Sequence, residues 1–116
     1  FIGIHPPPPI SLKSASIRNA QLKTVAQISR HSDVPVILAG DFNTTPFTGH
    51  FQRLLQEGDL KDSAVGFGFK NTWRRTGSVL PIDHVLVSKS MLVAHRELGP
   101  LMGSDHHPVI VDLQFP

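Results

Sequence analysis

The sequence contains no cysteine, and this absence excludes several kinds of chemistry. A chain without thiols forms no disulfide bond, offers no thiolate nucleophile and cannot build a cysteine-ligated zinc site. It also lacks a run of about 20 apolar residues, the length that a membrane-spanning helix needs, and it shows no signal peptide. Lysine and arginine are scattered, so no cluster argues strongly for nucleic-acid binding. The cellular compartment is therefore left open.

The composition that remains is that of an ordinary globular domain. At 116 residues with 40% apolar content, the chain is long enough for one domain, residues 1–116, with a single core. The net charge is +2 and the pI is near 9.4, which is compatible with phosphate-bearing partners. Seven histidines make the surface more cationic below neutral pH. Because the chain begins at Phe1, without methionine and inside an expected strand, we expect it to be a piece of a longer protein.

The rest of the chain is organised around an apolar run at residues 34–39 that leads into Gly40, Asp41 and Asn43. Aliphatic residues at both odd and even positions predict a strand that is buried on both faces. Asp41 and Asn43 then lie at its C-terminal end, where buried sheets commonly present their chemistry. A carboxylate can hold a hard cation or steer a reacting group. The alternative is an Asx-turn that caps the strand, since turns favour the same residues.

Further elements are predicted on both sides of this strand. Residues 1–5 end a strand, Pro6 to Pro9 stop it, and residues 14–32 form a helix, so that a β-α-β unit results. The apolar face of that helix is expected to contain Ile17, Leu22, Val25 and Ile28. Thr48 caps a short helix that ends before Gly58. Strands are expected at residues 82–88, 91–97 and 109–113, and loops at residues 60–63 and 66–81.

Polar residues flank three of these strands in a pattern that indicates hydrolysis. The three clusters are Asp41 with Asn43, Asp83 with His84, and Asp105 with His106 and His107. A histidine oriented by a carboxylate acts as a general acid, a general base or an electrophile, and a further carboxylate can bind a divalent metal. No serine lies in a nucleophile motif such as G-x-S-x-G. The clusters therefore favour metal-assisted attack by water.

Three motifs carry a specific resemblance. Gly40-Asp41-Phe42-Asn43, Ile82-Asp83-His84-Val85 and Ser104-Asp105-His106-His107-Pro108 occur in the order and rough spacing of the endonuclease/exonuclease/phosphatase (DNase I-like) superfamily. His5 before the proline run also matches a histidine of that family. The resemblance covers nearly the whole chain and is closest to bacterial members, some of which are membrane-anchored. It implies an α/β (α+β) four-layer sandwich, of which this chain would be the C-terminal half: a mostly antiparallel sheet with two helices on one face.

The resemblance also implies an activity and roles for single residues. The reaction would be Mg²⁺- or Mn²⁺-dependent hydrolysis of a phosphate ester. Asp41 would orient or deprotonate the attacking water and help to bind the metal, and Asn43 would bind a phosphoryl oxygen. His106 would contact the phosphate, with Asp83 holding its ring. Asp105 would bind the metal, and His5 would contact the phosphate or assist the leaving group. His107 is expected to be structural, since a residue before proline is held extended.

The family pattern also contains an asparagine and a metal-binding glutamate upstream of the strand that ends at His5, and no such segment exists here. We therefore expect impaired activity, and a sheet face that is covered by self-association. One alternative is a non-catalytic binding or assembly module that keeps the fold. Another is a histidine-rich metal-binding module, which the absence of H-x₃₋₅-H spacing disfavours. A cytoplasmic location and anchoring through upstream segments both stay open.

The substrate is not specified by these motifs, because nucleic acid, inositol phosphates and phospholipid headgroups all suit this type of site. Substrate contacts are expected in residues 66–80. Trp73 and Arg74 are the main candidates, since a tryptophan beside arginines can contact a phosphate or an aromatic ring. The alternative for Trp73 is that it covers the edge of the core.

Overall fold

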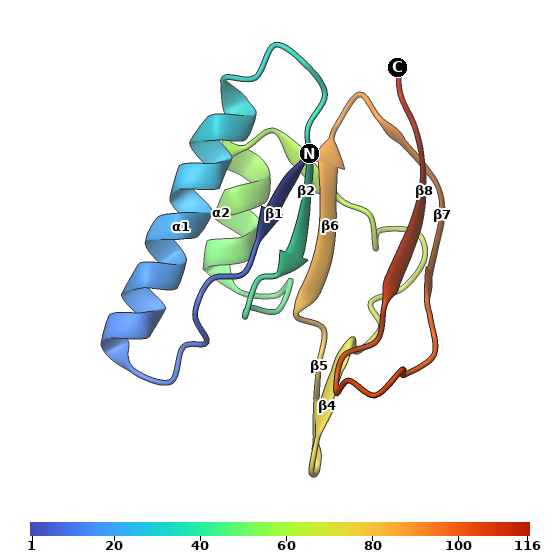
Figure 1. Ribbon diagram of the computed structural model, residues 1–116. Helices are drawn as coiled ribbons and strands as arrows, with labels where there is room; N and C mark the ends of the chain where they lie inside the picture. Colours follow the sequence, from blue (N-terminus) through green and yellow to red (C-terminus); the bar gives the residue numbers. More distant parts are fainter.

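Two helices and eight short strands make up the chain in the computed structural model, which describes residues 1–116 (Figure 1). Along the sequence they are β1 (Ile2–Ile4), α1 (Leu12–Arg30), β2 (Ile37–Asp41), α2 (Gly49–Glu57), β3 (Leu60–Asp62), β4 (Trp73–Arg75), β5 (Ser78–Leu80), β6 (Asp83–Ser88), β7 (Leu92–Leu98) and β8 (Val109–Gln114). Neither helix combines the length and the apolar character needed to cross a bilayer.

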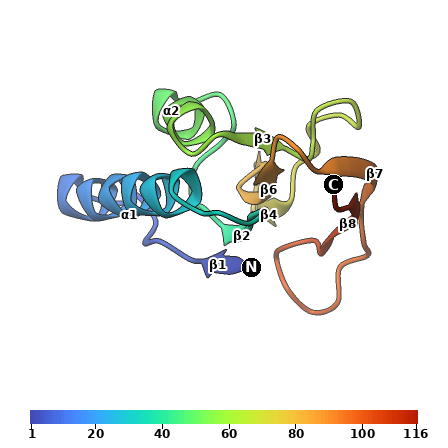
Figure 2. The same ribbon diagram turned by 90° about the horizontal axis from the view of Figure 1, so that it is seen from above.

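The main sheet has the strand order β1-β2-β6-β3. β1 and β2 are parallel and are joined through α1, so the predicted β-α-β unit is confirmed, whereas β6 pairs antiparallel with both β2 and β3. Both helices cover one face of this sheet, and the β7–β8 hairpin lies on the other side (Figures 1 and 2). The prediction of a mostly antiparallel α/β fold with two helices on one face is confirmed.

Helix α1 begins at Leu12, two residues earlier than predicted. Ser11 caps it by accepting a hydrogen bond from the Ser14 N–H, and the Ser14 hydroxyl accepts one in return from the Ser11 N–H. The buried face also differs from the prediction, since Ile17 and Ile28 are 42% and 52% exposed. The buried positions instead follow a stripe at intervals of three and four residues: Arg18, Leu22, Val25, Ala26 and Ser29. An arginine thus occupies a place on the core-facing side.

Helix α2 and the sheet enclose the core. Thr48 caps α2 by accepting the Phe51 N–H, as predicted, and Gly58 ends the helix. Phe51 and Leu54 pack on Leu38 of β2 and Leu86 of β6. The ring of His84 lies against Phe51, and its Nε2–H donates to the Thr44 carbonyl at 2.8 Å. Burial lowers the pKa of His84, so the ring is a neutral part of the core.

Two strand predictions need correction. The central strand is Ile37–Asp41 rather than residues 34–39, and it is not buried equally on both faces: Leu38 is fully buried under the helices, while Ile37 and Ala39 are half-buried. The expected loops contain β3 and the β4–β5 hairpin. These strands have three residues each, and β4 and β5 are mostly exposed, so they carry no apolar alternation that a sequence pattern could reveal.

Candidate active site

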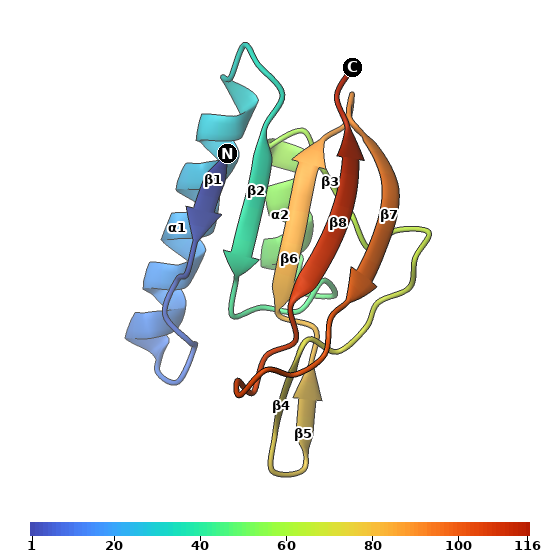
Figure 3. The same cartoon turned by 45° about the vertical axis from the view of Figure 1, so that its right-hand side comes forward.

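The predicted site residues gather at one end of the sheet. β1 and β2 end there, β6 begins there, and the β4–β5 hairpin and the loop before β8 extend from the same end (Figure 3). Asp41 and Asp83 are paired across β2 and β6, so the backbone register alone places these two carboxylates side by side. The topology thereby joins residues that are more than 40 positions apart in the sequence.

Gly40 brings His5 to the same place. A side chain on Gly40 would put its Cβ 1.9 Å from the Ile4 carbonyl oxygen, and the φ angle of 150° is one that other residues rarely adopt. Glycine therefore permits β1 to lie directly against β2. The next residue, His5, is exposed, and its Nε2 lies 3.5 Å from Asp41 Oδ2.

Asp83 and His106 form the best-defined pair of the site. The His106 Nδ1–H donates to Asp83, with distances of 2.8 and 3.1 Å to the two carboxylate oxygens. The Thr72 hydroxyl donates to Asp83 Oδ2 at 2.6 Å, and Thr72 itself accepts the backbone N–H groups of Ile82 and Asp83. Because Asp83 is held from two sides, it fixes the orientation of the imidazole ring.

The other ring nitrogen of His106 faces two further carboxylates. Nε2 lies 3.9 Å from Asp41 Oδ2 and 3.8 Å from Asp105 Oδ1. Partial burial opposes a charge on this ring, but the hydrogen bond to Asp83 and the charges of Asp83, Asp41 and Asp105 outweigh it and raise the pKa of His106. These charges therefore favour the protonated ring, whose Nε2 faces Asp41 and Asp105.

Asp41 and Asn43 form a tight turn at the end of β2. The Asn43 N–H donates to Asp41 Oδ1 at 2.8 Å, as the Asx-turn alternative predicted, and Asn43 has a φ of 49°. Burial raises the pKa of Asp41, and the nearby Asp83 adds to this effect, although the Asn43 N–H, His106 and His5 act against it. The Asn43 Nδ2 donates to the Pro6 carbonyl, so one of its two amide protons is already used.

The β4–β5 hairpin forms one wall of the site. The Trp73 Nε1–H donates to Asp105 Oδ2 at 3.0 Å, which orients this carboxylate. Trp73 and Arg75 line a pocket of about 640 Å³ together with His5, Asp41, Asn43 and His106. Arg74, which was predicted to contact substrate, does not line this pocket; it lies by the hairpin turn. Since side chains alternate along a strand, Arg75 rather than Arg74 faces the same way as Trp73.

The donor atoms fit a divalent cation that keeps part of its water shell. Asp41, Asp83 and His106 each offer a ligand atom within 4.8 Å of the others. Asp83 is engaged by His106 and Thr72, but Asp41 Oδ2 and Asp105 Oδ1 accept no hydrogen bond from the chain. Carboxylate oxygens are the ligands that Mg²⁺ and Mn²⁺ prefer, and Mg²⁺ usually retains several waters. The predicted pair of ligands, Asp41 and Asp105, thus flanks His106 Nε2.

Two residues at the site, Thr72 and Arg18, were not predicted, and Arg75 was expected only as one of several substrate contacts within residues 66–80. Thr72 and Arg75 belong to a stretch that reads as a loop, so only the folded chain shows which way they point. Arg18 did give a signal, because it lies four residues before Leu22 and thus on the buried stripe of α1. Two predicted neighbours point elsewhere: His84 lies in the core, and the His107 Nδ1–H donates to the Gly99 carbonyl.

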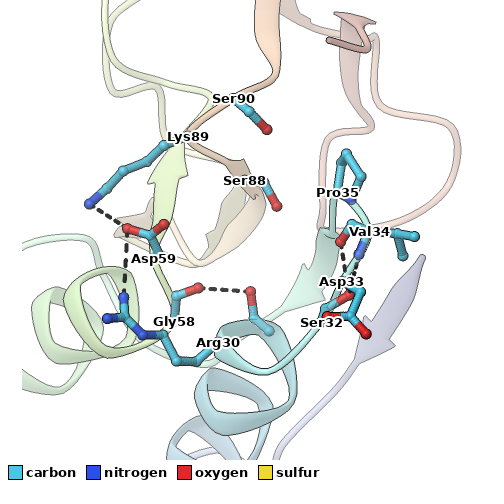
Figure 4. A pocket seen from close by; sticks show the side chains of 11 residues that line it. Arg30, Ser32, Asp33, Val34, Pro35, Gly58, Asp59, Ser88, Lys89 and Ser90 are labelled. Atoms are coloured by element: carbon cyan, nitrogen blue, oxygen red, sulfur yellow. Dashed lines mark hydrogen bonds and ion pairs between the residues drawn. The ribbon is translucent and has the colours of Figure 1, made fainter.

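A second polar hollow of about 450 Å³ contains none of the predicted residues (Figure 4). It lies where α1 and α2 end. Asp59 in this hollow is paired with Lys89 at 2.8 Å and with Arg30 at 3.9 Å. The hydrogen bond and the charge of Lys89 lower the pKa of Asp59. The charges of Asp59, Lys89 and Arg30 are paired with one another. We therefore consider this hollow a weaker candidate for a reactive site than the end of the sheet that carries Asp83 and His106.

The fold and the cluster define a class of α/β protein whose carboxylates and histidines converge at one end of a sheet. The sequence profile of the Endonuclease/Exonuclease/phosphatase family matches residues 2–106, and the chain belongs to this family. The family includes nucleases and phosphatases, and its members generally use divalent metals. A sequence search of curated proteins gave no match.

Solved structures have the same fold. The endonuclease/exonuclease/phosphatase from Bacteroides vulgatus superposes with a TM-score of 0.74 at 20% identity, over 87% of this chain and 45% of that one. The human Nocturnin catalytic domain with bound sulfate anion superposes with a TM-score of 0.69 at 21% identity, over 98% of this chain and 46% of that one. D. rerio TDP2 complexed with single-strand DNA product superposes with a TM-score of 0.67 at 20% identity, over 90% of this chain and 52% of that one. The chain therefore spans about half the length of these structures, and the likeness shows the fold alone.

Proposed function

We propose that this chain carries part of the active site of a divalent-metal-dependent phosphoesterase that uses water as the nucleophile. The observation that carries the proposal is the orientation of His106: Asp83 holds its Nδ1 at 2.8 Å, and its Nε2 faces Asp41 and Asp105. A histidine that is buttressed on one nitrogen and open on the other is suited to stabilise charge or to transfer a proton.

Each residue then has a role. Asp41 orients the attacking water from its position beside His106 Nε2. The imidazolium of His106 donates from Nε2 to a phosphoryl oxygen as negative charge develops there. The free amide proton of Asn43 can donate to another phosphoryl oxygen. His5 is exposed, so it can contact the phosphate or the leaving group.

Asp41 and Asp105 would hold the metal through their free carboxylate oxygens. A bound Mg²⁺ or Mn²⁺ would supply Lewis-acid stabilisation of the phosphoryl group.

The substrate is a phosphate ester that is larger than phosphate itself. The pocket beside His106 has about 640 Å³ and is bounded by Trp73, Arg75 and the proline segment at Pro8 and Pro9. The size of the pocket, and its lining by polar as well as apolar side chains, suit a phosphate attached to an aromatic or apolar body. Nucleic acid meets that description through its bases, whereas inositol phosphates and phospholipid headgroups, whose bodies are polar, suit the size of the pocket only; the TDP2 structure holds single-strand DNA product, and the Nocturnin structure holds sulfate.

A second function is a non-catalytic binding or assembly module. The observation in its favour is that the chain covers only 45–52% of the compared structures, so part of a catalytic site could be missing. Such a module would have no need of the Asp83–His106 pair or the Asp41 turn.

The catalytic proposal requires that Asp41 binds metal, and this requirement is tested first. Mn²⁺ is titrated into the chain, and paramagnetic broadening of the backbone amide signals is followed in the parent chain and in Asp41→Ala. We expect broadening centred on residues 41, 83 and 105–106, and its loss in Asp41→Ala. Asp59→Ala in the second hollow is the matched control and should broaden like the parent chain.

Hydrolysis is then assayed with bis(p-nitrophenyl) phosphate and with plasmid DNA. We expect slow cleavage that requires Mg²⁺ or Mn²⁺ and stops with EDTA and with Asp41→Ala. Mn²⁺ broadening that is absent, or that persists in Asp41→Ala, would contradict a metal site at Asp41. Metal binding without hydrolysis would favour the non-catalytic module for the isolated chain.

A further inference from the structure

Arg18 of α1 is a buried cation without a carboxylate partner. It is only 8% exposed, yet the groups to which it donates hydrogen bonds are neutral. Its Nη1 donates to the Asn43 carbonyl at 2.9 Å, and its Nε and Nη2 donate to Asn19 Oδ1 at 3.1 and 2.9 Å. Burial lowers the pKa of Arg18, because a buried charge without a counter-charge loses solvation. A charge retained here without a counter-charge calls for a specific reason.

Asn43, which Arg18 contacts, is the residue on which the turn at the end of β2 depends. Its φ of 49° is unusual for a residue with a side chain, so surrounding contacts must hold it there. In that conformation its N–H reaches Asp41 Oδ1, and its Nδ2 reaches the Pro6 carbonyl next to His5. The turn thus links the C-terminal ends of β1 and β2, and Arg18 holds it through the Asn43 carbonyl.

The arginine is itself held in place from behind. Asn19 accepts two of its N–H groups, and the Asn19 Nδ2 lies 3.1 Å from Nε2 of His50 in α2. The rigid guanidinium plane can serve Asn19 and Asn43 together, whereas a lysine ammonium could not reproduce this fork. Both helices are therefore connected to the turn through one side chain.

We propose that Arg18 is a positioning residue that clamps the turn at residues 41–43, and so sets where Asp41 and Asn43 lie in the site. The consequence for hydrolysis rests on the proposed function, but the clamp itself does not. Arg18 lines the wall of the pocket, and it acts through Asn43 rather than on the reacting atoms.

The test measures amide hydrogen exchange at Asn43, whose N–H is bonded to Asp41, in the chain without metal or substrate. Arg18→Met keeps much of the side-chain volume and removes the donors. We expect exchange at Asn43 to become at least about tenfold faster, because the turn loses a hydrogen bond from a charged donor. Arg30→Met, at the far end of the same helix, is the matched control and should leave Asn43 unchanged.

Two further variants keep the test decisive if Arg18→Met does not fold. Asn19→Ala leaves the charge in place but frees the guanidinium, and Arg18→Lys keeps the charge without the fork. Both should accelerate exchange at Asn43, Arg18→Lys by less than Arg18→Met. Unchanged exchange in Asn19→Ala and Arg18→Lys, with native spectra elsewhere, would overturn the clamp.

Where hydrolysis is measurable, Arg18→Met should lower kcat with little change in KM, since the turn positions Asp41 rather than binding the substrate body. Because the exchange experiment needs no turnover, an inactive chain with fast exchange would count against the proposed function and still support the clamp.

Discussion

At the scale of single residues, the two ring nitrogens of His106 have different surroundings: one is held by Asp83, and the other is open to the site. Nδ1 of His106 is fully used by Asp83, and Asp83 is in turn anchored by Thr72. Nε2 is left to face Asp41 and Asp105. This division has a measurable consequence, because the charge of Asp83 is part of what makes His106 easier to protonate than a free histidine.

Replacing Asp83 by Asn should lower the pKa of His106. The variant keeps an acceptor for Nδ1–H but loses the negative charge, so both the hydrogen bond and the Coulomb attraction weaken. Two-dimensional NMR titration of the ring protons in the metal-free chain would measure the change. Asp59→Asn is the control at the other end of the sheet, and an unaltered His106 titration in Asp83→Asn would contradict the pairing.

The same substitution should change stability in a pH-dependent way. The folded pKa of His106 lies above the unfolded value of about 6.5, so the pair stabilises the fold fully below that value. This stabilisation is lost as the pH rises through the folded pKa. Asp83→Asn should therefore destabilise the chain more at about pH 6 than at about pH 9, measured by urea unfolding. An equal effect at both pH values would show that the charge is not responsible.

Gly40 is the residue whose replacement should disturb the backbone of the site most. In Gly40→Ala the new Cβ would overlap the Ile4 carbonyl at a φ of 150°, so β1 would have to move away from β2. We expect a loss of about 2–4 kcal/mol in the free energy of unfolding. Gly3→Ala on β1 is the control, because its nearest contact is 3.8 Å away, and it should change stability by less than about 1 kcal/mol.

At the scale of secondary-structure elements, the β4–β5 hairpin determines which side chains border the pocket. Trp73 pairs with Leu80, and Arg75 pairs with Ser78, so the odd-numbered residues of β4 share one side. The hairpin is attached to the loop before β8 by the Arg74 N–H to the Asp105 carbonyl and by the His107 N–H to the Thr72 carbonyl. The loop that carries Asp105 and His106 is therefore positioned by β4.

Arg75→Ala should raise the KM of the proposed hydrolysis by about fivefold, with a smaller fall in kcat, because its side chain borders the pocket and not the reacting atoms. Trp73→Ala should raise KM too, and it should also lower kcat, since Asp105 loses a hydrogen bond. Arg74→Ala is the matched control with less than about twofold effect. A larger effect of Arg74→Ala than of Arg75→Ala would show that the other side of the β4–β5 hairpin faces the substrate.

The elements that could be predicted from the sequence are those with strong patterns. Helix α2 was located through Thr48, its apolar residues and Gly58, and β6 through its unbroken apolar run. The clusters at residues 41–43, 83 and 105–106 were found because ionisable residues next to apolar strands are unusual. The hairpin escaped prediction, since its short exposed strands are specified by pairing with each other and by Asp105. Thr72 became visible only through its contact with Asp83, 11 positions away. The spacing in α1 could have placed Arg18 on the buried side, but its contact with Asn43, 25 positions away, needed the structure.

At the scale of the whole molecule, the sheet has one well-covered face and one that is covered in part. The helices bury Leu38 and Leu86, and Val87 on the opposite face is fully buried, whereas Ile37 and Ala39 on that face remain half-buried. Phe1, beside the start of β1, is 89% exposed. The chain also spans only about half the length of the compared structures. Apolar surface of this kind tends to be covered in solution.

We therefore expect the isolated chain to associate with itself at tens of micromolar. Light scattering should give a mass above the monomer value of 12.7 kDa. Ile37→Lys and Phe1→Lys should lower the measured mass toward that of the monomer, because a charge on the half-covered face opposes its burial against a second copy. Ile28→Lys, at an exposed position on the helical side, is the control and should leave the mass unchanged. A monomeric mass for the parent chain would contradict self-association and would mean that the β7–β8 hairpin already covers enough of the face.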